Sequence, residues 1–102
     1  MAYTTIDDPS AYFQTKLWTG NGGTQSITLD GLNDMQPDWV WVKQRGGTTN
    51  HKNSDSVRGA TKALQNNDAD AEATDSDGIT SFDSNGFSLG AGGDYNGSSN
   101  TQ

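Results

Sequence analysis

A short run of aromatic and β-branched residues, Trp39-Val40-Trp41-Val42, constrains the fold of this chain more than any other feature. Successive side chains of a strand point to opposite faces, so the two tryptophans share one face and the two valines share the other. A strand that is apolar on both faces needs cover on both, as in the middle of a β-sandwich. The pattern therefore predicts a central strand over residues 38–44, with both tryptophans buried in the core.

The rest of the chain offers little apolar material. Leu, Ile, Val and Phe together number 14 of 102 residues, below the roughly 20% at which chains begin to resemble disordered ones. Three Trp, three Tyr and three Phe supply enough apolar surface for one small core. Gly, Ser, Thr, Asn and Asp account for 56 residues, a composition typical of turns and short strands. We predict a single all-β domain, a small antiparallel β-sandwich.

Charge and cysteine content exclude several classes of function. The net charge of −7 argues against nucleic acid as the main partner. The chain has no cysteine, so neither disulfides nor thiolate metal sites are available to stabilise it. No apolar run reaches the roughly 18 residues of a membrane span, and the N-terminus has no signal region. We expect a protein made in the cytoplasm, with no membrane insertion.

Residues 1–15 are predicted to form an extended or loosely turned N-terminal arm, and residues 16–102 the sandwich domain. The arm contains Asp8-Pro9-Ser10, which favours a turn. Its large side chains, Tyr3, Tyr12 and Phe13, are candidate anchors on a binding partner.

Alternating apolar residues and turn signals predict the remaining elements. Asn85-Gly86 indicates a hairpin turn, and Gly20 to Gly23 a second turn. Residues 48–58 and 68–78 are polar and are predicted to be exposed loops. The expected strands cover residues 16–19, 24–29, 79–82 and 86–89, with residues 61–65 either a strand or a helical turn.

The 46–58 loop carries four candidate binding residues, because binding groups concentrate on long loops of β scaffolds. They are Asn50, His51, Asp55 and Arg58. Asn50 and His51 are expected to bond to backbone across the loop, and Arg58 to form an ion pair with Asp55 or Asp38.

No catalytic or metal site is predicted. His51, Asp55 and a neighbouring serine have the chemistry of a catalytic triad, but they share one polar loop and lack a nucleophile elbow. The acidic run from Asp68 to Gly78 does not have the glycine and glutamate spacing of a calcium loop. One histidine and no cysteine are too few ligands for zinc. We expect a protein that is not an enzyme and binds no cofactor.

Three segments of the sequence resemble a module of bacteriophage structural proteins. They are Gln36-Pro37-Asp38-Trp39-Val40-Trp41-Val42-Lys43-Gln44-Arg45, then Asn50-His51 with Asp55 and Val57-Arg58-Gly59, then Ser81-Phe82 with Asn85 to Gly90. The opening residues 1–15 also resemble the N-terminus of such proteins. The module is similar to concanavalin A-like or laminin-G-like domains of tail fibres, and it implies a jelly-roll-like fold.

The resemblance has one departure. In proteins of this type an apolar strand containing Val-Ala-Trp follows the Tyr-Asn segment, here Tyr95-Asn96, and this sequence stops at Gln102 instead. We therefore expect an incomplete sandwich, which either continues beyond residue 102 in a longer protein or is completed by a neighbouring chain.

The resemblance implies a virion protein located in the tail. The leading hypothesis is an N-terminal tail-fibre domain that anchors the fibre to tail or baseplate proteins and forms a homo-oligomer, expected to be a trimer. Two alternatives remain open: a lectin-like module that binds a host surface glycan through the 46–58 loop, and a capsid decoration protein.

Overall fold

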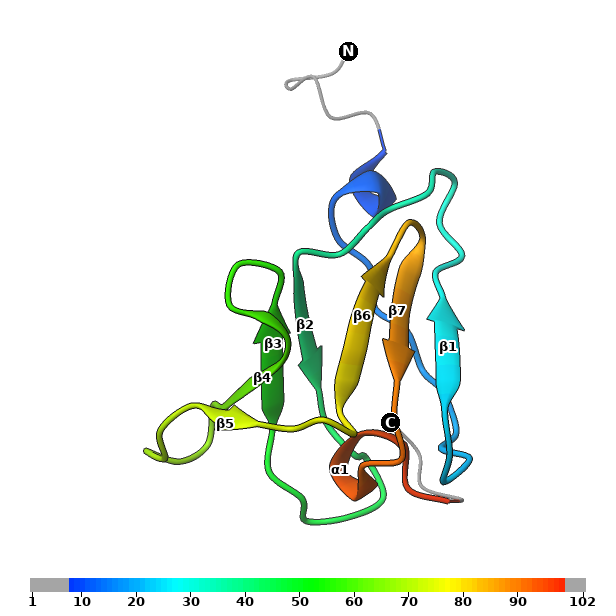
Figure 1. Cartoon of the computed structure of the whole chain (residues 1–102). Helices are drawn as coiled ribbons and strands as arrows, with labels where there is room; N and C mark the ends of the chain where they lie inside the picture. Colours follow the sequence, from blue (N-terminus) through cyan, green and yellow to red (C-terminus); the bar gives the residue numbers. More distant parts are fainter. Residues whose placement is uncertain (1–7, 99–102) are drawn as a thin grey trace.

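The computed structural model describes residues 8–98, which form two antiparallel β-sheets and almost no helix (Figure 1). One sheet has three strands in the order β1-β7-β6, and the other has four in the order β2-β3-β4-β5. The elements are a 3₁₀ helix Pro9–Ala11, β1 Gln25–Thr28, β2 Trp39–Val42, β3 Lys52–Asp55, β4 Gly59–Gln65, β5 Ala73–Thr74, β6 Ile79–Asp83, β7 Gly86–Leu89 and α1 Gly93–Asn96.

The core lies between the two sheets and draws on both of them. Alternation along each strand turns one set of apolar side chains inward. The buried cluster consists of Ile27, Val40, Val42, Ile79, Phe87, Leu89 and, from α1, Tyr95. The predicted all-β sandwich is confirmed.

The hairpin of β6 and β7 forms as the sequence predicts. Gly86 adopts φ 148°, a conformation that favours glycine. Asn85, in the turn, accepts a hydrogen bond from the Met35 N–H at 3.1 Å and donates one to the Leu29 carbonyl at 3.1 Å. The turn thereby holds the segment that leads from β1 towards β2.

Three predicted segments differ in the structure. The predicted 68–78 loop contains the short strand β5, Ala73–Thr74, which pairs with β4. The polar stretch 48–58 is not one loop, because β3 lies inside it between β2 and β4. Asn53 and Ser54 of this strand are buried, although neither is apolar. Pairing on both edges satisfies the backbone of β3, so the strand forms without the usual sequence pattern. Residues 16–19 form no strand; Thr19 makes only an isolated bridge.

The orientation of β2 also corrects a prediction. Val40 and Val42 point into the core, whereas Trp39 and Trp41 point outward and are each 52% exposed. Phe87, Ile79 and Leu89 of the opposite sheet already occupy the space between the sheets, and the smaller valines fit against them.

The C-terminal part of the domain is held by polar contacts. The Asn96 side chain is fully buried and donates to the carbonyls of Gly23 and Gly90. Lys52 of β3 forms ion pairs with Asp75 at 3.4 Å and Asp94 at 3.3 Å. These contacts join α1 to both sheets.

The described part of the N-terminal arm begins with a tight turn. Asp8 caps the 3₁₀ helix by accepting a hydrogen bond from the Ser10 N–H, as the Asp-Pro-Ser pattern predicts. The arm is tied to the loop after β1, because the side chain of Gln14 accepts a hydrogen bond from the Gly31 N–H. Tyr3 lies outside the described residues.

Candidate binding cleft along strand β2

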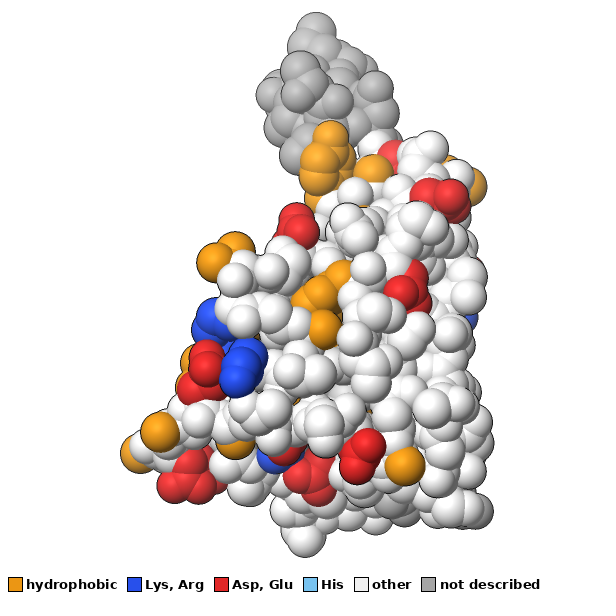
Figure 2. Space-filling view, viewed as in Figure 1, with side chains coloured by type: hydrophobic (Ala, Val, Ile, Leu, Met, Phe, Trp, Pro, Cys, Tyr) orange, Lys and Arg blue, Asp and Glu red, His pale blue; other side chains and the backbone are white. Residues whose placement is uncertain are grey.

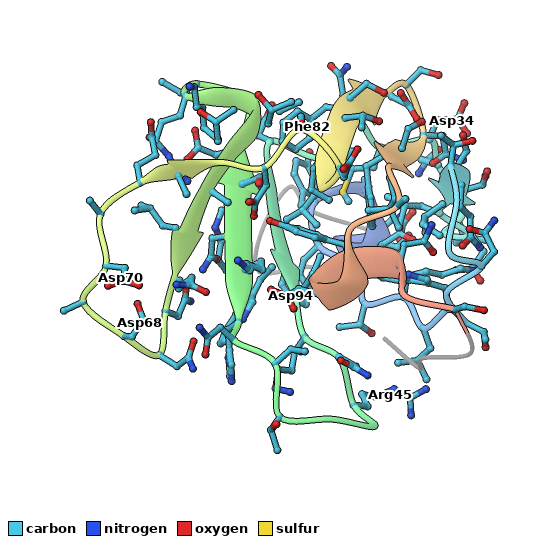
Figure 3. The ribbon with its side chains drawn as sticks, turned by 60° about the horizontal axis from the view of Figure 1, so that its bottom comes forward. Asp34, Arg45, Asp68, Asp70, Phe82 and Asp94 are labelled. Atoms are coloured by element: carbon cyan, nitrogen blue, oxygen red, sulfur yellow. The ribbon has the colours of Figure 1, made fainter. Side chains whose placement is uncertain are left out.

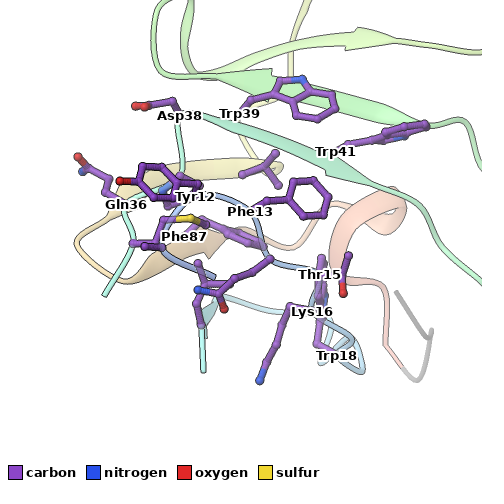
Figure 4. A pocket seen from close by; sticks show the side chains of 16 residues that line it. Tyr12, Phe13, Thr15, Lys16, Trp18, Gln36, Asp38, Trp39, Trp41 and Phe87 are labelled. Atoms are coloured by element: carbon purple, nitrogen blue, oxygen red, sulfur yellow. The ribbon is translucent and has the colours of Figure 1, made fainter. Parts of the chain in front are cut away.

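An open cleft of about 500 Å³ lies between strand β2 and the chain segment that follows the 3₁₀ helix (Figure 4). The lining residues come from the arm, from the segment before β2, from β2 itself and from the core: Ala11, Tyr12, Phe13, Gln14, Thr15, Lys16, Trp18, Leu29, Met35, Gln36, Pro37, Asp38, Trp39, Val40, Trp41 and Phe87.

The cleft runs along the free edge of β2. Side chains from both faces of the strand line it, the inward Val40 as well as the outward Trp39 and Trp41. Only a cavity along the edge of a strand meets both of its faces. The other edge of β2 is taken by β3, and within residues 8–98 β2 pairs with no second strand.

Aromatic side chains stand on both sides of this cleft. Tyr12 and Phe13 of the arm are 69% and 68% exposed, and they lie across from the outward tryptophans of β2 (Figure 4). The buried residues Leu29, Val40 and Phe87 form its base. Large aromatic surface concentrated around one hollow is typical of a place where a partner docks.

The cleft has little charge. Only Lys16 and Asp38 among its lining residues are ionisable groups of full charge at neutral pH. Lys16 is held by Asp30 at 2.8 Å, and this ammonium lowers the pKa of the Asp30 carboxyl. The Asp38 carboxylate accepts a hydrogen bond from the Ser56 hydroxyl at 3.1 Å. The cleft therefore suits an uncharged ligand better than an ionic one.

Beside the cleft, the outer face of the four-stranded sheet continues the aromatic surface. The rings of Trp39 and Trp41 lie 6.0 Å apart, measured between centroids. The imidazole of His51 lies 5.7 Å from the Trp41 ring at an angle of 35°. His51 thus belongs to the surface next to the cleft, although it does not line the cleft.

The predicted contacts of Asn50 and His51 form in a different way. The Asn50 amide donates to the Gln65 side chain at 2.7 Å and accepts from the Asn67 amide. The backbone N–H of His51 donates to the Asn67 side chain. These bonds fasten the run before β3 to the turn after β4, which gives Asn50 a structural role here.

Asp55 and Arg58 form the predicted ion pair. The Asp55 carboxylate accepts from the backbone N–H of Arg58 at 2.7 Å and from its Nε at 2.6 Å. These bonds lower the pKa of Asp55 and raise the pKa of Arg58. Arg58 also pairs with Glu72 at 3.2 Å. The pair closes the turn between β3 and β4, and basic and acidic side chains lie side by side on this flank of the domain, below the turn (Figure 2).

The polar residues of this region do not assemble into a triad. Asp55 is engaged by Arg58, and the Ser56 hydroxyl donates to Asp38. Ser54 is buried on the opposite face of β3 from Asp55.

Within residues 8–98, no group of three or more His, Cys, Asp and Glu side chains is arranged to hold a metal ion. Asp68 and Asp70 lie in the exposed loop between β4 and β5 (Figure 3), where the Asp68 carboxylate accepts hydrogen bonds from Gln65 of β4 and from Asn50. The same part of the chain contains no helix with the length and apolar character to cross a membrane.

A second, polar hollow of about 340 Å³ lies between β3, the turn before β6 and α1. Lys52 and its two carboxylate partners occupy it, and the Tyr95 hydroxyl donates to Asp75 at 2.9 Å. Burial raises the pKa of Tyr95 well above its usual value. We regard this hollow as structural, because Lys52 bridges Asp75 and Asp94 across it.

Sequence reasoning identified Tyr12 and Phe13 but placed Trp39 and Trp41 in the core. The alternation in β2 places the two valines on one face of the strand and the two tryptophans on the other. It does not show which pair faces the core, because both residue types are apolar.

Comparison with known proteins places the chain in a family but gives no relative of known activity. Neither the curated proteins nor the solved structures contain a match to it. The model of one protein family matches residues 8–102, nearly the whole chain. The chain therefore belongs to the family described as "Domain of unknown function (DUF7483)".

Proposed function

We propose that this chain is a structural module of a bacteriophage tail fibre, which joins other proteins of the virion through the cleft along β2. The observation that carries the proposal is the aromatic cleft itself. It has four large aromatic side chains at its rim and a strand edge that no other strand of residues 8–98 pairs with. The sequence resemblance to phage structural proteins supplies the biological setting.

The chemistry of the cleft supports a protein partner. Aromatic residues are enriched at the centres of protein interfaces, and charged residues are depleted there. Burying the half-exposed rings of Trp39 and Trp41 would favour association, since each Trp can bury roughly 150–250 Å². The arm residues Tyr12 and Phe13 would pack on the same partner, in the anchoring role expected of them.

The partners that we propose are further copies of this chain, forming a trimer, together with tail or baseplate proteins. The fibre would be made in the host cytoplasm and act in the tail of the virion. A surplus of acidic groups elsewhere on the domain would keep crowded copies soluble.

Substitutions in the cleft test this function. Phe13→Ser and Trp39→Thr remove exposed rings from the cleft and should leave the fold intact. We expect them to reduce incorporation of the protein into virions at least tenfold, measured by quantitative immunoblotting of purified particles.

Val57→Thr is the matched control, because Val57 is 93% exposed but lies in the β3–β4 turn, outside the cleft. Equal incorporation of all three variants would contradict the proposal. Recovery of the protein in tail-less capsids alone would favour the decoration role instead.

A glycan-binding role is the second candidate, and one observation favours it. Trp39 and Trp41 present half-exposed rings beside His51 on an outer sheet face. Such rings can stack on the apolar face of a sugar. Binding to a glycan array that is lost in Trp41→Thr, with unchanged virion incorporation, would support this role over assembly.

A further inference from the structure

We infer that the free edge of β2 accepts an added β-strand, and that the occupant is an uncharged, extended segment supplied by a neighbouring protein of the virion. The inference rests on the proposed function in assuming a protein partner, and it adds the mode of binding and the chemistry of that partner.

The backbone of β2 is suited to this mode. Within residues 8–98 it pairs with β3 alone, so the hydrogen-bonding groups along its second edge have no strand to pair with. A strand laid along this edge would lie about 4.8 Å from β2. Main-chain hydrogen bonds would supply affinity, and alternate side chains would supply specificity.

The other outer strand of the same sheet is protected against such pairing. β5 has only two residues, Ala73 and Thr74, and the acidic residues Glu72 and Asp75 flank it. Short length and charge are common ways to prevent edge-to-edge association. β2 is twice as long, with four residues, and it presents two tryptophans beside its edge.

The strands at the ends of the smaller sheet differ from β2. β1 presents polar residues, Ser26 and Thr28, on its outward face, where β2 presents tryptophans. β6 lies against β4 of the larger sheet. Compared with these strands, the edge of β2 is the one best suited to pair with a strand of a partner.

Charge and shape define the occupant. Lys16 and Asp38 are the charged residues of the cleft, and both already have partners. An occupant with an unpaired charge would lose hydration without compensation. Inward side chains of the added strand would fill the cleft above Val40 and Phe87, so aliphatic residues suit them. Outward side chains would pack beside Trp39 and Trp41.

A fused strand tests this chemistry. The whole chain is extended after Gln102 by a flexible Gly/Ser linker and a short strand that alternates valine and threonine. The linker raises the effective concentration of the strand to roughly the millimolar range. We expect at least tenfold slower hydrogen exchange of the amides of residues 39–42, and a blue shift of tryptophan fluorescence, relative to the chain with the linker alone.

Two control strands separate strand pairing from general hydrophobic contact. In the first, proline replaces every residue of the strand, which keeps the segment uncharged and extended but removes all of its backbone N–H donors. In the second, lysine replaces each valine. Neither control should slow exchange of the β2 amides. Equal protection by the proline control, or no protection by the valine strand, would overturn the inference.

Hydrogen exchange of the chain without any fused strand, measured at several protein concentrations, tests whether the occupant is a second copy of the chain. Protection of residues 39–42 that increases with protein concentration would overturn a separate partner and assign the edge to a second copy. Loss of virion incorporation in the cleft variants, combined with no protection by the valine strand, would reject strand addition while leaving the proposed function in place.

Discussion

At the scale of single residues, the polar groups of this domain act mainly through short local bonds. Asp83 is a clear case, since its carboxylate accepts hydrogen bonds from the Ser81 hydroxyl at 2.6 Å and the Ser88 hydroxyl at 2.7 Å. The Ser81 bond, followed by the Ser88 bond, lowers the pKa of Asp83 in the folded state. The ionised form of this side chain therefore stabilises the fold.

The stability contributed by Asp83 should depend on pH. A carboxyl whose pKa is lower in the folded than in the unfolded state stabilises the protein above the unfolded value of about 3.9. This contribution is lost as the pH falls through the folded-state pKa. We expect Asp83→Asn to be less stable than the parent at pH 7 and to differ from it less at pH 2, measured by urea denaturation. A constant difference across this range would contradict the assignment.

Three glycines differ in whether a side chain would strain the backbone, collide with neighbouring atoms, or do neither. A Cβ at Gly86 would collide with the Ile27 carbonyl, and φ there is also positive, at 148°. Gly59 has φ 109° but open space around it, and Gly93 has neither constraint.

We therefore expect Gly86→Ala to cost at least about 2 kcal/mol and Gly59→Ala about 1 kcal/mol. Gly93→Ala should be nearly neutral. Free energies of unfolding of the three variants would test this order, and a smaller loss for Gly86→Ala than for Gly59→Ala would contradict it.

At the scale of elements, the two faces of β2 have different roles: the inward face stabilises the fold, and the outward face is proposed to bind a partner. Val42 is 1% exposed and belongs to the core, whereas Trp41 is half exposed beside the cleft. Val42→Ala should lower the free energy of unfolding by about 2 kcal/mol, since it removes buried methyl groups. Trp41→Thr should cost less than about 1 kcal/mol while weakening association.

Thermal or chemical denaturation of the two variants checks the division. Trp41→Thr removes far more apolar atoms than Val42→Ala, so composition alone would predict the opposite order. A larger loss of stability for Trp41→Thr would mean that the tryptophan face is structural.

Elements differ in how far sequence predicts them. β1, β2, β6 and β7 have alternating or continuous apolar residues and were predictable, as was the Asn85-Gly86 turn. β3 was not, because Lys52, Asn53, Ser54 and Asp55 contain no apolar residue. This strand exists because β2 and β4 pair with it on both edges, and backbone pairing of this kind leaves no trace in local sequence.

At the scale of the whole molecule, one cation connects distant elements. Lys52 reaches from β3 to Asp75 before β6 and to Asp94 in α1, and its side chain is only 12% exposed. Lys52→Met keeps most of the apolar stem but leaves the two carboxylates without their cation. We expect a loss of about 1 kcal/mol, because both carboxylates are partly solvated.

Lys62→Met is the matched control, since the Lys62 ammonium bonds to the exposed Thr74 hydroxyl. Hydrogen exchange would localise the effect, with faster exchange expected around α1 only in Lys52→Met. Equal exchange of the α1 amides in both variants would show that Lys52 does not hold the helix.

The candidate site was predictable only in part. Tyr12 and Phe13 stood out in the sequence as large side chains within a polar arm. The cleft between them and β2 could not be predicted, because it depends on where the arm crosses the sheet. Arg58 and Asp55 are close in sequence, so their pairing was foreseeable; their location at a turn and not in a binding loop depends on β3.

The sequence by itself determined that this chain folds as a small β-sandwich and that residues 39–42 have two apolar faces. It also determined which side chains share a face, because the period of a strand is a local property of the backbone. Only the tertiary structure decided which face is inside. That choice depends on the space left by Ile79, Phe87 and Leu89 of the opposite sheet. Two valines fit this space, and so both tryptophans remain at the surface beside the cleft.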